Sequence, residues 1–129
     1  MNTAGFIVSN TESWLTPKVL PVLAFLITGI VAFSTGTSWG TYAIMIPIAV
    51  PLAFNFSGNE LNTIVYATIA AIAGGGVFGD HCSPLSDTSI LASTGAASDH
   101  IDHIKTQMPY ALTIGFISVL IYLIIGWSI

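Results

Sequence analysis

The chain has 129 residues, of which 53% are hydrophobic and only 6% are charged. Ordinary globular domains contain about 25% charged residues, so this composition excludes a water-soluble domain and predicts an all-α protein integral to a lipid bilayer. The net charge of −4 sets six acidic residues against Lys18 and Lys105, which leaves no basic patch and excludes nucleic-acid binding. Cys82 is the single cysteine, so the chain holds no internal disulfide.

Residues 15–54 contain two apolar runs around a hydroxyl-rich stretch, 34–41. The second run, 42–54, is interrupted by two prolines and extends only about 20 Å as a helix, too short to cross a bilayer. Either the first run spans and the second is a broken partial helix, or both runs are arms of a re-entrant hairpin. The hairpin is favoured because non-helical backbone at membrane depth is tolerated where it lines a cavity. An ordinary surface loop with an interfacial tryptophan is the plainer alternative.

The sequence of residues 55–62 is polar and predicts a loop. The sequence of 61–97 predicts an interrupted helix after it. The apolar part, 61–77, is followed by a glycine-rich and polar stretch, 74–89, where glycines and a proline weaken a helix. Unwound backbone in a membrane frees carbonyl groups that need hydrogen-bond partners or a cation. We expect the helix to resume with Ser83 as its N-cap and Pro84 at its first position, ending near residue 97.

Residues 98–108 alternate apolar and charged side chains at helical spacing, which predicts an amphipathic segment lying at the membrane interface. Pro109 then begins the clearest transmembrane helix, 109–127, which ends at a tryptophan suited to the headgroup region. The whole chain, 1–129, is therefore interpreted as one transmembrane region.

Oxygen atoms gather in the interrupted segment, and sodium prefers oxygen ligands. The candidate cation- and proton-binding side chains are Asp80, Ser83, Ser86, Asp87 and Thr88. A carboxylate that holds either a cation or a proton gives exchange, because protonation removes the charge that holds the cation. Each carboxylate also has a plainer interpretation. Asp80 reaches the far interface if the helix runs on, and Asp87 falls in a first helical turn, where acidic residues are common.

Two other chemistries fit the residues less well. The side chains of Asp80 to Cys82 and of 99–103 include residue types that bind zinc, but their spacing is unspecific for a tetrahedral site. Cys82 beside His81 lacks an orienting third group for nucleophilic catalysis. We therefore expect no enzyme activity, no cofactor and no metal other than transported Na+.

A longer pattern carries a family resemblance. The run GDHCSPLSDTSILASTGAASDHIDHIKTQMPYAL, 79–112, resembles the signature of the NhaC family of sodium/proton antiporters, and FSTGTSWGTYAIMIPIAVPLA, 33–53, resembles a second family stretch. The resemblance implies inverted repeats, each with a re-entrant hairpin and an interrupted helix. It also implies that the tip of the hairpin, 34–41, faces 80–88, with Thr35, Thr37 and Ser38 completing the oxygen shell.

The resemblance implies sodium/proton antiport, with Na+ and H+ as transported ions, in a bacterial cytoplasmic membrane. Family members are several times longer, so the chain corresponds to a C-terminal portion, and its expected partner is a missing N-terminal repeat or a companion chain. Two alternatives stay open. One is an antiporter for organic acids such as malate or lactate, coupled to sodium or protons, and the other is a non-transporting membrane subunit.

Overall fold

The computed structural model describes residues 15–128, which form helices joined by short connections and contain no strand. This confirms the predicted all-α class. The elements are η1 (Pro17–Val19), α2 (Leu20–Thr35), α3 (Ser38–Phe56), α4 (Thr63–Cys82), α5 (Asp87–Gly95) and α6 (His100–Ser128). Four helical segments are long and apolar enough to cross a membrane: 17–35, 38–56, 63–82 and 100–128.

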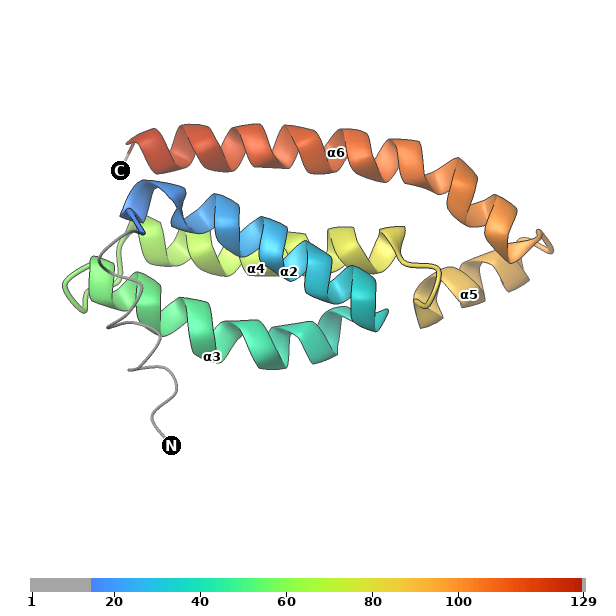
Figure 1. The fold of residues 1–129 in the computed structure, drawn as a ribbon, viewed down its shortest axis with the longest axis horizontal. Coiled ribbons are helices and arrows are strands. Elements are labelled where there is room, and N and C mark those ends of the chain that lie inside the picture. The colour runs from blue at the N-terminus through green and yellow to red at the C-terminus, as the bar shows by residue number, and fades with distance from the viewer. Residues whose placement is uncertain (1–14, 129) are drawn as a thin grey trace.

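The four long helices run side by side and alternate in direction, while short α5 lies at one end of the bundle (Figure 1). Helix α4 is central, because it packs against α2, α3 and α6. Within the apolar windows, 56% of α4 is buried but only 6% of α6. Helix α4 is therefore the long helix that the bundle encloses most completely, and its buried residues extend from Ile64 to Cys82.

The glycines of α4 allow another helix to pack closely against it, and they do not interrupt α4. Helix α4 continues through Gly74–Gly76 and ends only at Cys82, so the expected break at the glycines is wrong. A Cβ added at Gly75 would lie 3.1 Å from the carbonyl carbon of Phe25, and one at Gly79 would lie 2.8 Å from the backbone nitrogen of Phe33. Small residues thus let α2 approach the α4 backbone, as is common between membrane helices.

The second apolar run is longer than expected. Helix α3 begins at Ser38, because the Thr37 side chain accepts a hydrogen bond from the Gly40 amide and caps the helix. Its 19 residues extend about 28 Å despite Pro47 and Pro51, so the expectation of a partial helix is wrong. Only Gly36 and Thr37 separate α2 from α3.

The expected interfacial segment and the last transmembrane helix are one element. Asp99 Oδ1 accepts hydrogen bonds from the amides of Ile101 at 2.9 Å and Asp102 at 3.1 Å, and this cap begins α6 at His100. The helix continues past Pro109 and curves toward α5 at its N-terminal end (Figure 1). A proline that removes one internal hydrogen bond can bend a helix without ending it.

Aromatic side chains close the core between α2, α4 and α6. The Phe25 ring lies 5.6 Å from the ring of Phe78 and 5.6 Å from that of Tyr122. Near the C-terminal end of α6, the Lys18 ammonium lies 5.5 Å from the centre of the Trp127 ring. The two residue types expected at a membrane interface therefore meet at the same end of the bundle.

Candidate functional site

Asp80 lies in the last turn of α4, and its side chain is buried. The Thr88 hydroxyl donates a hydrogen bond to Asp80 Oδ2 at 3.3 Å, and the Ser86 and Thr88 hydroxyl oxygens lie 2.7 Å apart. Asp80, Ser86 and Thr88 thus form a connected group of oxygen atoms, which we call the Asp80 cluster.

The second carboxylate oxygen of Asp80 distinguishes this cluster from an ordinary helix end. Oδ1 is buried and has no hydrogen-bond partner among residues 15–128. Buried polar atoms are nearly always satisfied, so an orphaned carboxylate oxygen calls for an explanation such as an ion or a proton. Asp80 Oδ1 is therefore the atom best placed to hold one.

The connection between α4 and α5 begins at Ser83, which is also buried. Its hydroxyl donates to the Phe33 carbonyl at 2.7 Å and accepts from the Leu85 amide at 3.1 Å. Ser86, not Ser83, caps α5, since the Ser86 hydroxyl accepts from the Ser89 amide. The helix therefore resumes three residues later than expected, and Pro84 lies in the connection.

Asp87 and the hairpin residues lie outside the cluster. Asp87 is exposed, and its Oδ1 accepts a hydrogen bond from the Thr88 amide. The hydroxyls of Thr35 and Thr37 make hydrogen bonds within the α2–α3 turn; one example is the 3.3 Å contact from Thr35 to the Thr41 hydroxyl. Ser38 begins α3.

The α2–α3 turn nevertheless lies against the α4–α5 connection. A Cβ at Gly36 would lie 2.7 Å from the carbonyl carbon of Leu85. Backbone therefore meets backbone at this point, and the turn reaches the connection through Gly36.

His100 is a residue that reasoning from the sequence missed. Its Nε2 lies 2.8 Å from the Pro84 carbonyl oxygen, and its Nδ1 lies 3.1 Å from the Ser93 hydroxyl. Ser93 is buried on α5. In the sequence, His100 belonged to a charged, amphipathic segment, and no spacing rule connected it with a proline sixteen residues earlier.

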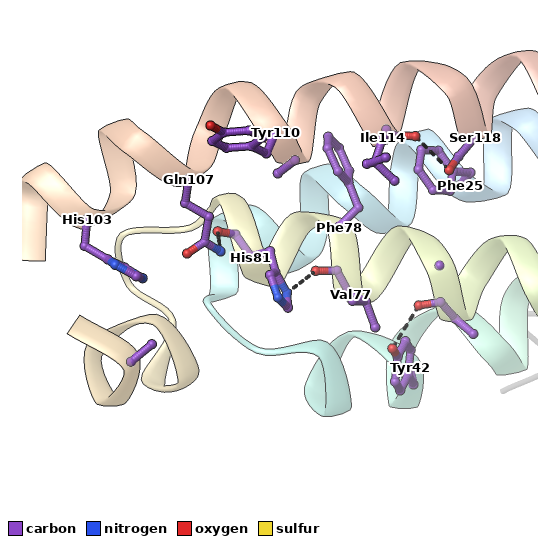
Figure 2. Close-up of a pocket in the computed structure, with 15 residues that line it drawn as sticks. Phe25, Tyr42, Val77, Phe78, His81, His103, Gln107, Tyr110, Ile114 and Ser118 are labelled. Carbon is purple, nitrogen blue, oxygen red and sulfur yellow. Dashed lines mark hydrogen bonds between the residues drawn. The ribbon is translucent and has the colours of Figure 1, made fainter. Parts of the chain in front are cut away.

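A separate cavity of about 770 Å³ lies between α4 and α6, and Figure 2 shows its lining. Phe78 and Ile114 contribute apolar surface, while Gln107 donates to the His81 carbonyl at 3.1 Å. His103 also lines the cavity, and its Nε2 is buried without a partner among the described residues. Asp80 does not line this cavity, so the two features are distinct.

The zinc alternative gains no support from the fold. Within residues 15–128, no group of three or more histidine, cysteine, aspartate or glutamate side chains is arranged to hold a metal ion. Both ring nitrogens of His100 already face protein atoms, and Asp99 caps a helix.

Comparison with known proteins gives a consistent result. A model of the Na+/H+ antiporter family matches residues 1–127. An uncharacterized protein of Haemophilus influenzae is 42% identical over 128 residues, covering 99% of this chain and 24% of the relative. An uncharacterized Na+/H+ antiporter of the same organism is 36% identical over 112 residues, covering 87% of this chain and 23% of the relative.

A third relative is the arginine/ornithine antiporter ArcD of Halobacterium salinarum. It is 35% identical over 124 residues, covering 96% of this chain and 24% of the relative. The chain thus spans about a quarter of the length of the curated relatives that it matches. No solved structure matches it.

Proposed function

Because the chain belongs to the Na+/H+ antiporter family and is an integral membrane protein, we propose that it provides part of the ion pathway of a sodium/proton antiporter. In this proposal Asp80 is the principal carrier, and it holds Na+ and H+ alternately. Ser86 and Thr88 supply hydroxyl oxygens beside it.

The observation that carries the proposal is the buried Asp80 carboxylate with one unpartnered oxygen. Burying a carboxylate oxygen without a hydrogen-bond partner is costly, so a buried carboxylate of this kind among membrane-spanning helices is a functional-site hypothesis. Its neighbours offer oxygen atoms, which suit a hard cation, and the Thr88 hydroxyl keeps the carboxylate oriented. Both a sodium ion and a proton would be held by the same oxygen, Oδ1. Binding of one therefore excludes the other, and this competition couples their movements.

The remaining parts of the pathway are assigned by the same proposal. Asp87, an exposed carboxylate next to Thr88 in the chain, is a second candidate carrier, and Ser83 is a further buried hydroxyl on the α4–α5 connection. Thr35, Thr37 and Ser38 lie on the turn that meets the α4–α5 connection, and in a re-entrant arrangement they would add oxygens to the shell.

An inverted-repeat architecture would place the counterpart of this bundle on a second repeat. That repeat would lie elsewhere in the same polypeptide or on a companion chain. The quarter-length match to the relatives supports this, and so does the exposure of α6, whose apolar window is only 6% buried. Alternating access would come from one repeat moving against the other.

A second candidate function is antiport of an organic solute, with sodium or protons as the coupling ion. It is favoured by the relative whose name specifies exchange of arginine and ornithine. Under this function Asp80 would hold the coupling ion. Adding the organic solute would then change the rate of sodium-dependent proton flux, by competition or by acceleration. Malate, lactate, arginine and ornithine are the compounds to test.

Sodium-dependent proton flux in everted membrane vesicles tests the first function. The transporter that contains this chain is expressed in a host lacking its own antiporters, with Asp80→Asn as the variant and Asp102→Asn as the control. Asp102 is an exposed carboxylate paired with Lys105 at 3.3 Å. We expect Asp80→Asn to abolish exchange and Asp102→Asn to preserve it. Normal exchange in Asp80→Asn would refute the proposed role of Asp80.

A further inference from the structure

His100 connects three segments near the Asp80 cluster: α6, the α4–α5 connection and α5. It occupies the first position of α6, its Nε2 faces the Pro84 carbonyl at 2.8 Å, and its Nδ1 faces the Ser93 hydroxyl at 3.1 Å. A carbonyl oxygen can only accept a hydrogen bond, so Nε2 carries a proton and donates it to Pro84. The tautomer of His100 is thereby assigned by its partner.

Pro84 lies on the α4–α5 connection between two serines whose hydroxyls are hydrogen-bonded. Proline has no amide hydrogen, so this residue cannot fasten itself through its own N–H group. On one side of it Ser83 bonds to the Phe33 carbonyl, and on the other side Ser86 bonds to Thr88. The His100 ring fixes the carbonyl between these two serines.

The connection is therefore held from two directions. Helix α2 fixes it through Phe33 and Ser83, and α6 fixes it through His100 and Pro84. The Ser93 contact also ties His100 to α5, the helix that carries Thr88. A shift of the Pro84 carbonyl would move Ser86, whose hydroxyl contacts the Thr88 hydroxyl, and Thr88 is the donor to Asp80.

We propose that His100 is a positioning residue for the Asp80 cluster: it holds the Pro84 carbonyl so that the Ser86 and Thr88 hydroxyls are aligned beside Asp80. This inference rests on the proposed function, since it concerns the same site. His100 itself touches neither the ion nor Asp80. Its effect is transmitted through backbone, as residues behind metal ligands commonly act.

Two substitutions separate the contacts of the ring. In His100→Gln the terminal amide nitrogen reaches about as far as Nε2 and can still donate to Pro84, whereas in His100→Asn the shorter amide corresponds to Nδ1 and leaves Pro84 without its donor. The control is His103→Gln, one turn further along α6, at a residue that lines the separate cavity. Each variant is made in the complete transporter, and its amount in the membrane is measured.

The first readout is the sodium concentration that gives half-maximal proton exchange, measured alongside the maximal rate. We expect His100→Asn to raise that concentration by about 10- to 100-fold, the usual effect of removing a residue that orients metal ligands. His100→Gln should stay close to the native value, and His103→Gln should match it. Equal half-maximal sodium concentrations in all three variants would overturn the proposal. A loss of protein or maximal rate in both His100 variants, with unchanged half-saturation, would also overturn it.

The second readout does not depend on transport. Hydrogen exchange followed by mass spectrometry should show faster exchange of the amides of Leu85 and Ser86 in His100→Asn than in His100→Gln, without sodium present. Unchanged protection would overturn the positioning role directly.

The Asp80→Asn variant distinguishes the two failures. If it exchanges sodium normally, the proposed role of Asp80 fails, and the positioning role of His100 fails with it. If it loses exchange while His100→Asn behaves like the native protein, only the positioning role is wrong.

Discussion

The Ser83 hydroxyl donates a hydrogen bond to the Phe33 carbonyl at 2.7 Å, across a separation of fifty residues. Phe33 lies in the last turn of α2, where carbonyl groups have no partner within the helix. The bond therefore satisfies a helix end and fixes the α4–α5 connection beside α2. It joins the two parts of the chain that the sequence marked as polar interruptions.

Replacing Ser83 with alanine should destabilise the protein by about 1–3 kcal/mol, because the buried Ser83 hydroxyl is removed and the Phe33 carbonyl loses this partner. The matched control is Ser34→Ala. Ser34 is exposed, and its one hydroxyl bond within residues 15–128 is to the Ile30 carbonyl of its own helix. Thermal unfolding in detergent, followed by circular dichroism, measures both. Equal effects of the two substitutions would show that the bond to Phe33 contributes nothing.

Gly36→Ala should destabilise the protein more than Gly58→Ala does. Both glycines have a positive φ, 68° and 70°, so alanine is strained by about 1–2 kcal/mol at either position. Only at Gly36 does the added Cβ meet another segment, the Leu85 backbone at 2.7 Å, whereas a Cβ added at Gly58 would have no such neighbour within 4 Å. The additional destabilisation by Gly36→Ala, about 1–3 kcal/mol, reports the contact between the α2–α3 turn and the α4–α5 connection.

The difference in stability between Gly36→Ala and Gly58→Ala is measured from their thermal unfolding midpoints in the same detergent. Indistinguishable midpoints would mean that the turn and the connection are not in firm contact.

Gly79→Ala should disrupt the packing of α2 against α4. The added Cβ would collide with the Gly29 carbonyl and lie 2.8 Å from Ala32 Cβ, and backbone atoms cannot rotate out of its way. We expect a loss of about 1–3 kcal/mol. Gly95→Ala is the control, since nothing lies within 4 Å of its Cβ. Alanine is the better helix former by about 0.5–1 kcal/mol, so this control should be neutral or slightly stabilising. A loss of stability at both positions would indicate a general intolerance to substitution.

Thr88→Val should weaken sodium binding about tenfold while leaving the fold intact, because a hydrogen bond to a charged group contributes roughly 1.5–3 kcal/mol. The substitution keeps the shape of the side chain and removes the hydroxyl that contacts Asp80 and Ser86. The control is Thr94→Val, since the Thr94 hydroxyl bonds to the Ile90 carbonyl on the same helix. The sodium dependence of proton exchange is the measurement, and a native value in Thr88→Val would count against the cluster.

The sequence allowed prediction of the helical class, and it grouped Asp80, Ser86 and Thr88 in one candidate site together with Asp87 and the hairpin residues, which lie outside the Asp80 cluster. Composition indicated a bilayer, and the joint occurrence of Asp80, Ser86 and Thr88 in one polar stretch indicated oxygen ligands. Local patterns suffice for such inferences, because helix formation and polar clustering are visible in neighbouring residues.

The role of the glycines could not be predicted in the same way. Gly75 and Gly79 look like helix breakers when α4 is considered alone, and they become packing residues only when the α2 backbone lies against them. The His100 contact with Pro84 is of the same kind, since it depends on where α6 begins relative to α5. Tertiary contacts decided both, and a single sequence carries no direct record of them.

The gap between Cys82 and Asp87 also has an electrostatic consequence. Helix α4 ends there with its carbonyl groups and α5 begins there with its amide groups, so opposite ends of two helix dipoles meet at the Asp80 cluster. The carbonyl end of α4 attracts a cation, while the amide end of α5 attracts the carboxylate and opposes a cation. A small displacement of α5 from α4 would change this balance without altering any side chain. If the Asp80 cluster binds a cation as proposed, the position of a nine-residue helix would then set the strength of that binding.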